Sequence, residues 1–103
     1  MDRKEMLQQV LAANPDDAFA RYGLAMEYAR AGEIETALAE YTTLLQKNPD
    51  YTAAYFMAAQ MLAGAERTEE AKQFLRDGIA SAQRTGNAHA KSEMEGMLQE
   101  LGG

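Results

Sequence analysis

The chain of 103 residues is long enough for one small domain, and its 47% hydrophobic and 25% charged residues exclude a disordered protein. Sixteen acidic against ten basic residues leave a formal net charge of -6, which repels phosphate backbones and anionic lipids, so we expect neither nucleic acid nor a membrane as partner. The absence of cysteine excludes disulfides, thiolate metal sites and a cysteine nucleophile.

Helix dominates the expected secondary structure, because twenty alanines and ten leucines stand against one valine and two isoleucines. Apolar residues recur at spacings of three and four, which gathers them on one face of each helix. Gly32 stands where a left-handed residue can end a helix, and Pro49 where a helix must stop. In chain order, these signals predict helices over 3–13, 17–31, 34–47, 51–64, 67–84 and 88–101.

An internal repeat organises these helices. The triplet that begins at Asn14 (Asn-Pro-Asp) recurs at Asn48, an offset of thirty-four residues. The same offset aligns residues of like character: Ala20 with Ala54, Tyr22 with Phe56, Ala25 with Ala59, Ala37 with Ala71, and Tyr41 with Leu75. Each unit therefore contains two helices, and the N-terminal segment is the second half of an earlier unit.

The C-terminal part departs from this pattern. Gln83 stands where the offset would place a proline, so the fifth helix is expected to run on until Gly86 stops it. The last helix has one apolar stripe and a wide polar face, which is typical of the solvent-facing end of a repeat stack. Its stripe consists of Ala90, Met94, Leu98 and Leu101.

These residues resemble the tetratricopeptide repeat, a unit of thirty-four residues. Leu24, Ala25, Tyr28, Ala37, Tyr41 and Pro49 fit the first copy, and Tyr55, Ala59, Leu62, Ala71 and Leu75 fit the second. The chain departs from the pattern at Arg21, where a large aromatic is expected, and the second copy lacks the closing proline. The resemblance implies an all-α fold, a right-handed α-solenoid of about six helices in antiparallel pairs.

The repeat divides the single expected domain, 1–103, into four parts. They are an N-terminal half repeat (1–14), a first full repeat (15–48), a second full repeat (49–84) and a C-terminal capping helix (85–103). Whether the chain is a whole protein or part of a longer repeat protein stays open.

No set of residues indicates catalysis, a metal or a cofactor. His89 and Glu93 form a helical i, i+4 pair, but two ligands do not make a metal site. The acidic pairs 16–17 and 69–70 invite an acid/base role, yet each begins a predicted helix, where capping and the helix dipole favour acids. Because there is neither a nucleophile motif nor a glycine-rich phosphate loop, we expect a protein that is not an enzyme.

In the family that the chain resembles, the first helices of successive units line a groove that binds peptides or helices. The resemblance assigns this role to Phe19, Tyr22, Met26, Arg30, Ala53, Phe56, Met57, Gln60 and Gly64, and to Lys91 and Met94 of the capping helix. Tyr22, Met26 and Met57 stand where a Lys, Asn and Arg clamp would hold the carboxylate tail of a chaperone, which argues against such a ligand. Aromatic and methionine side chains suit an apolar or amphipathic segment instead, unless they only pack between helices.

The sequence therefore predicts a cytoplasmic, non-catalytic scaffold or adaptor module that binds a protein or peptide partner. The alternative is a structural unit that forms a homodimer through its terminal helices. That alternative rests on the half repeat at the N-terminus, which would expose Met6, Leu7, Val10 and Leu11.

Overall fold

The computed structural model describes residues 1–103 and contains six α-helices and no strand. Each helix begins and ends within one residue of its predicted bounds, so the all-α prediction is confirmed. Measured against the length and apolarity that a bilayer span requires, every helix falls short. The helices are α1 (Arg3–Ala13), α2 (Ala18–Arg30), α3 (Ile34–Lys47), α4 (Thr52–Gly64), α5 (Thr68–Thr85) and α6 (Ala88–Glu100).

Left-handed residues end helices at the predicted places. Gly32 follows α2 with φ 78°, and Gly86 follows α5 with φ 69°. The prediction of a longer fifth helix is confirmed as well, since α5 has 18 residues against 14 in α3. Glu66, thirty-four residues after Gly32, adopts φ 62° without being a glycine. The second copy therefore keeps the turn of the first at a cost of about 1–2 kcal/mol of backbone strain.

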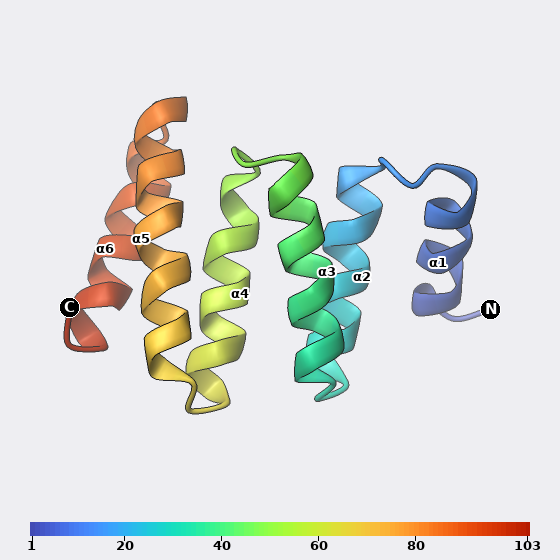
Figure 1. The fold of residues 1–103 in the computed structure, drawn as a ribbon, viewed down its shortest axis with the longest axis horizontal. Helices are drawn as coiled ribbons and strands as arrows, with labels where there is room; N and C mark the ends of the chain where they lie inside the picture. Colours follow the sequence, from blue (N-terminus) through green and yellow to red (C-terminus); the bar gives the residue numbers. More distant parts are fainter. The chain divides into compact units, whose positions relative to one another are not determined.

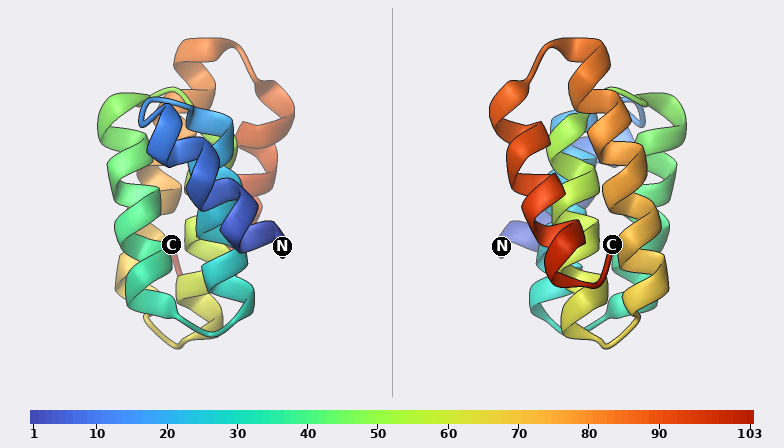
Figure 2. Two further views of the ribbon diagram at one scale, coloured as in Figure 1. Left: turned by 90° about the vertical axis from the view of Figure 1, so that its right-hand side faces the viewer. Right: turned by 90° about the vertical axis from the view of Figure 1, so that its left-hand side faces the viewer.

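The helices form two compact units, residues 1–48 and residues 49–103. In the first unit α2 packs against both α1 and α3, and in the second α5 packs against both α4 and α6 (Figure 1). Figure 2 shows α1 crossing α2 in its left view, and α6 lying beside α4 and α5 in its right view. A smaller contact joins α4 to α6 directly.

The buried residues follow the repeat. Six pairs that are thirty-four residues apart are buried in both copies: Ala20 and Ala54, Leu24 and Ala58, Ala25 and Ala59, Ala37 and Ala71, Tyr41 and Leu75, and Leu44 and Gly78. Most of these positions hold alanine, whose short side chain lets the two helices of a pair approach closely. The repeat register read from the sequence thus fixes which helix faces pack.

Two glycines inside helices of the second unit have opposite surroundings. A β-carbon placed on Gly78 of α5 would lie 2.5 Å from Met94 Sδ and 2.6 Å from Tyr55 Cβ. Since Tyr55 Cβ is tied to the backbone of α4, it cannot move aside cheaply. A β-carbon on Gly96 of α6 would meet nothing within 4 Å. Gly78 is therefore required for helix packing, whereas Gly96 is not.

We predict that Gly78→Ala lowers the free energy of unfolding by about 1–2 kcal/mol, because overpacking outweighs the better helix propensity of alanine. Gly96→Ala is expected to raise the free energy of unfolding by about 0.5–1 kcal/mol, since it gains the propensity without a clash. Urea denaturation of both variants and the wild type measures the two effects. A stabilising Gly78→Ala would contradict the packing described for α5.

Two buried tyrosines differ in how their hydroxyl groups are satisfied. Tyr55 donates a hydrogen bond of 2.6 Å to the carbonyl oxygen of Pro49. The Tyr41 hydroxyl is buried without a hydrogen-bond partner. Burial raises the pKa of Tyr41 well above its usual value, the neighbouring Tyr22 raises it further, and Arg30 lowers it. Tyr41 is thus held as a neutral phenol that contributes packing and no hydrogen bond.

Tyr41→Phe is expected to leave the free energy of unfolding unchanged or to raise it by about 1 kcal/mol, because it removes a buried polar atom that has no partner. Tyr55→Phe, the matched control, should lower it by about 1 kcal/mol through the lost hydrogen bond. Because the folded-state pKa of Tyr41 is raised, its contribution is intact below about pH 10 and is lost as the pH rises further. Denaturation midpoints from neutral to strongly alkaline pH should accordingly fall less steeply for Tyr41→Phe than for the wild type.

Candidate functional site

In the first unit, the predicted groove residues form a strip along one face of α2. Phe19, Tyr22, Met26 and Arg30 are spaced by three and four residues, which places them on that face. Phe19 is 70% exposed, Arg30 is exposed, and Tyr22 and Met26 are half-buried. The Arg30 guanidinium lies 2.9 Å from Glu27 of the same helix. This strip is therefore accessible and largely apolar.

In the second unit, the corresponding strip lies on α4. Ala53 and Gln60 are exposed, and Phe56 and Met57 are half-buried. None of the thirteen residues of α4 is charged. Any charge beside this strip therefore comes from other helices, such as α6.

Of the two residues predicted on the capping helix, Met94 is not accessible. Met94 is only 1% exposed and packs into the core over Gly78, so it is not available to a ligand. Lys91 is half-buried and lies 4.0 Å from Glu95. The physical reason is the length of α5. It moves the start of α6 to thirty-six residues after the start of α4, whereas α4 starts thirty-four after α2.

With that two-residue shift, α4 and α6 enclose a groove, here called the α4–α6 groove, of about 380 Å³. Predicted residues Phe56 and Gln60 line it from α4. The α6 side was missed by the sequence analysis, although its spacing of three and four residues, one position away from the buried stripe, could have indicated it. The α6 residues are Ser92, Glu93, Gly96, Met97 and Glu100.

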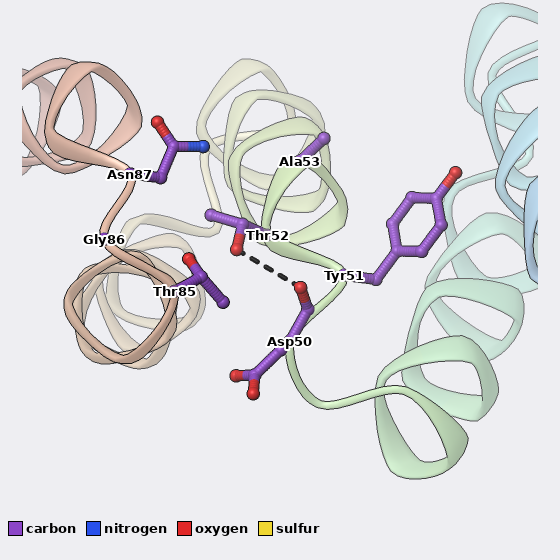
Figure 3. Close-up of a pocket in the computed structure, with 7 residues that line it drawn as sticks. All are labelled: Asp50, Tyr51, Thr52, Ala53, Thr85, Gly86 and Asn87. Carbon is purple, nitrogen blue, oxygen red and sulfur yellow. Dashed lines mark hydrogen bonds between the residues drawn. The ribbon is translucent and has the colours of Figure 1, made fainter.

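A larger hollow of about 680 Å³ lies at the start of α4 and the turn between α5 and α6 (Figure 3). Its lining is mostly polar and comes from residues 50–53 and 85–87. Two helices begin here, but Asn87 already accepts a hydrogen bond from the amide of Ala90 at 3.1 Å. The hollow is a recess between helix ends whose polar groups serve the fold.

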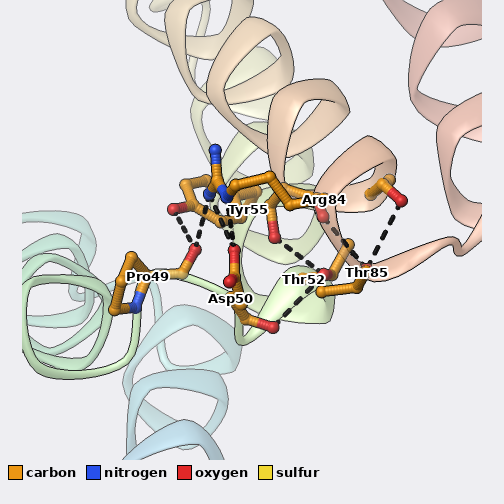
Figure 4. Close-up of polar contacts among 8 residues, drawn as sticks. Pro49, Asp50, Thr52, Tyr55, Arg84 and Thr85 are labelled. Carbon is orange, nitrogen blue, oxygen red and sulfur yellow. Dashed lines mark hydrogen bonds and ion pairs between the residues drawn. The ribbon is translucent and has the colours of Figure 1, made fainter.

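Polar side chains in and beside this hollow form hydrogen bonds and an ion pair with one another (Figure 4). Arg84 Nη2 lies 2.7 Å from the Asp50 carboxylate, and the hydroxyl groups of Thr52 and buried Ser81 are 2.8 Å apart. The hydrogen bond with Asp50 is the main reason that the pKa of Arg84 is raised. These contacts tie the end of α5 to the chain before α4.

The acidic residues considered for catalysis have structural partners. Asp17 caps α2 by accepting a hydrogen bond of 2.9 Å from the amide of Ala20. Arg67 hydrogen-bonds to Glu70 at 2.7 Å, which lowers the pKa of that carboxyl. A lowered pKa opposes the role of a general acid at neutral pH.

The pair of His89 and Glu93 is not joined by a third potential metal ligand. His89 Nε2 lies 3.1 Å from Glu93 Oε1, with the histidine side chain 86% exposed. No three acidic or histidine side chains of the chain come together as a cluster that could hold a metal ion. The strips on α2 and α4 and the α4–α6 groove are accessible surfaces to which none of these structural roles applies.

Comparison with known proteins matches tetratricopeptide repeat models to residues 28–93 and 2–52. A TPR repeat-containing protein of Pseudomonas aeruginosa is 30% identical over 97 residues, 94% of this chain and 92% of that protein. A tetratricopeptide repeat domain protein from Salinibacter ruber superposes with a TM-score of 0.80 at 28% identity, over 86% of this chain and 90% of that one. PcrH in complex with the chaperone-binding region of PopD superposes with a TM-score of 0.87 over 95% of this chain and 74% of that one, and at 18% identity it shows the fold alone. The chain belongs to the tetratricopeptide repeat family.

Proposed function

We propose that this protein is a non-catalytic interaction module that binds a peptide or an amphipathic helix of a partner protein. The binding surface consists of the strips on α2 and α4, the first helices of the two full repeats, and of the α4–α6 groove. The α4–α6 groove carries the proposal, because it combines an accessible aromatic ring, Phe56, with a methionine, Met97, and an open backbone at Gly96. Such a lining suits an apolar side chain, since aromatic rings and methionine bury area at a small entropic cost. The family is typical of modules that bind proteins rather than of enzymes.

The chemistry of the α4–α6 groove favours an amphipathic segment over a carboxylate tail. A buried carboxylate needs paired cationic donors, and the lining of the α4–α6 groove has no lysine or arginine. In the solved complex, PcrH holds the chaperone-binding region of PopD on a fold similar to this one. That complex supports a segment of a protein as the ligand. Which kind of segment binds this chain is inferred from the chain's own residues.

Selection from a display library of amphipathic helical peptides tests the proposal. We expect enriched peptides to shift the backbone NMR resonances of α2 and α4, because the accessible apolar side chains lie there. The double substitution Tyr22→Ala/Phe56→Ala should weaken binding at least about tenfold, as for aromatic anchors at other interfaces.

Phe74→Ala is the matched control for this experiment. It removes a half-buried ring from α5, outside both strips, and is expected to leave the affinity unchanged. Melting temperatures of all variants are recorded so that loss of binding is compared only among folded proteins. Failure to enrich any peptide, or shifts confined to other helices, would contradict the proposed function.

Self-association is the second candidate function. The large hydrophobic side chains that are most exposed, Met1, Met6, Val10 and Phe19, all lie in the first nineteen residues. Leu7 is not among them: Leu7 Cδ1 would lie 3.2 Å from a β-carbon on Gly23, so Leu7 packs toward α2. The outer face of α1, rather than the Leu7 side, is the surface that a second copy would cover.

If self-association occurs, light scattering will show a dimer that Met6→Asp/Val10→Asp converts to a monomer. The reason is that a charge on each exposed position opposes burial of α1 against another copy. Gln9→Asp, an exposed position on the same helix, is the control for added charge. A wild-type monomer at all concentrations would exclude this candidate and leave the peptide-binding proposal unaffected.

A further inference from the structure

The rim of the α4–α6 groove is acidic. Glu93 and Glu100 both line it, seven residues apart on the same face of α6, and no lysine or arginine is among the lining residues. Since α4 has no charged residue, nothing on the opposite wall neutralises them. The groove therefore joins an apolar floor to a negative rim that no lining lysine or arginine neutralises.

The acidic side chains of this rim have no lysine or arginine as an ion-pair partner. Glu93 is paired with His89, which is charged only when protonated, and Glu100 has no ion pair. Lys91, the cation of α6, lies 4.0 Å from Glu95 instead. Glu100 is also the last residue of α6, where the helix dipole disfavours a negative charge. The stability of α6 thus gives no reason for an acid at this position.

The floor of the groove has room for a side chain from outside. Nothing lies within 4 Å of a β-carbon placed on Gly96, and the rings and chains beside it are Phe56 and Met97. A volume of about 380 Å³ is at the small end for ligand sites and fits one or two apolar side chains. A glycine inside a helix weakens it, so the open space is not needed for folding.

We infer that the α4–α6 groove binds a cationic amphipathic segment of a partner protein. An apolar side chain of that segment enters over Gly96 between Phe56 and Met97, and flanking lysine or arginine residues lie beside Glu93 and Glu100. The inference rests on the proposed function and names the chemistry of the partner. Acidic tails, nucleic acids and anionic membranes are disfavoured by the same rim.

Two amphipathic helical peptides of equal length test this assignment. They share their apolar residues, and one carries lysine and arginine where the other carries glutamate. The cationic peptide should bind at least about tenfold more tightly at low salt, because two exposed ion pairs are made in place of two repulsions. High salt should reduce this difference, since the rim is exposed and screened.

Variants of the protein locate the binding. Gly96→Leu should abolish binding of the cationic peptide, because the new side chain occupies the space over Gly96, where a β-carbon meets nothing within 4 Å. Ala39→Leu is the control, since Ala39 is an exposed helical position of α3 that does not line the groove. Glu93→Gln/Glu100→Gln should remove the preference for the cationic peptide, whereas Glu95→Gln, on another face of α6, should leave it unchanged.

The outcomes separate the inference from the proposed function. Equal or tighter binding of the acidic peptide, or binding that Gly96→Leu leaves intact, overturns the inference while peptide binding stands. If neither peptide binds and the display library yields nothing, both are overturned. Self-association of the protein that Gly96→Leu abolishes would also overturn the inference, because a second copy would then be the occupant.

Discussion

Close approach of paired helices is the constraint on which the rest of the structure depends. Ala37 and Ala71 are fully buried where the two helices of each pair meet, and Gly78 performs the same task where α5 meets α4 and α6. With so little side-chain volume at these positions, larger residues nearby, such as Tyr41 and Leu75, fill the adjoining space. The packed faces take up the small residues and leave the outer faces of α2 and α4 free to vary.

The position of Met94 decides what α6 presents to α4. Its burial over Gly78 fixes the rotation of α6 about its own axis. The stripe that contains Glu93, Gly96 and Met97 is then turned toward Phe56. A change in the packing of Met94 would rotate this stripe, so the composition of the groove is a consequence of the core.

Helix bounds, the left-handed glycines and the packed repeat positions could be predicted, because periodicity and a thirty-four-residue offset encode them locally. The capping helix could not be placed in the same way. The thirty-four-residue offset, carried past Gln83, assigned Met94 to the groove, but the extended α5 shifts the register by two residues and Met94 is buried. Which face α6 turns toward α4 depends on tertiary contacts, such as the packing of Met94 over Gly78, which one sequence does not reveal. Phe56 and Gln60 were found because the register was still intact on α4.

Two residues of α6 are unfavourable for the stability of the helix, and both lie at the same groove. Their position says more about function than the net charge of -6 does. Gly96 weakens the interior of α6 by about 1 kcal/mol relative to alanine, although a β-carbon would fit there. Glu100 places a negative charge at the end of the helix where the dipole opposes it. Both residues line the α4–α6 groove. Natural sequences tend to keep local choices consistent with the fold except at functional sites. Two unfavourable choices at one groove therefore support the cationic ligand that we infer for it.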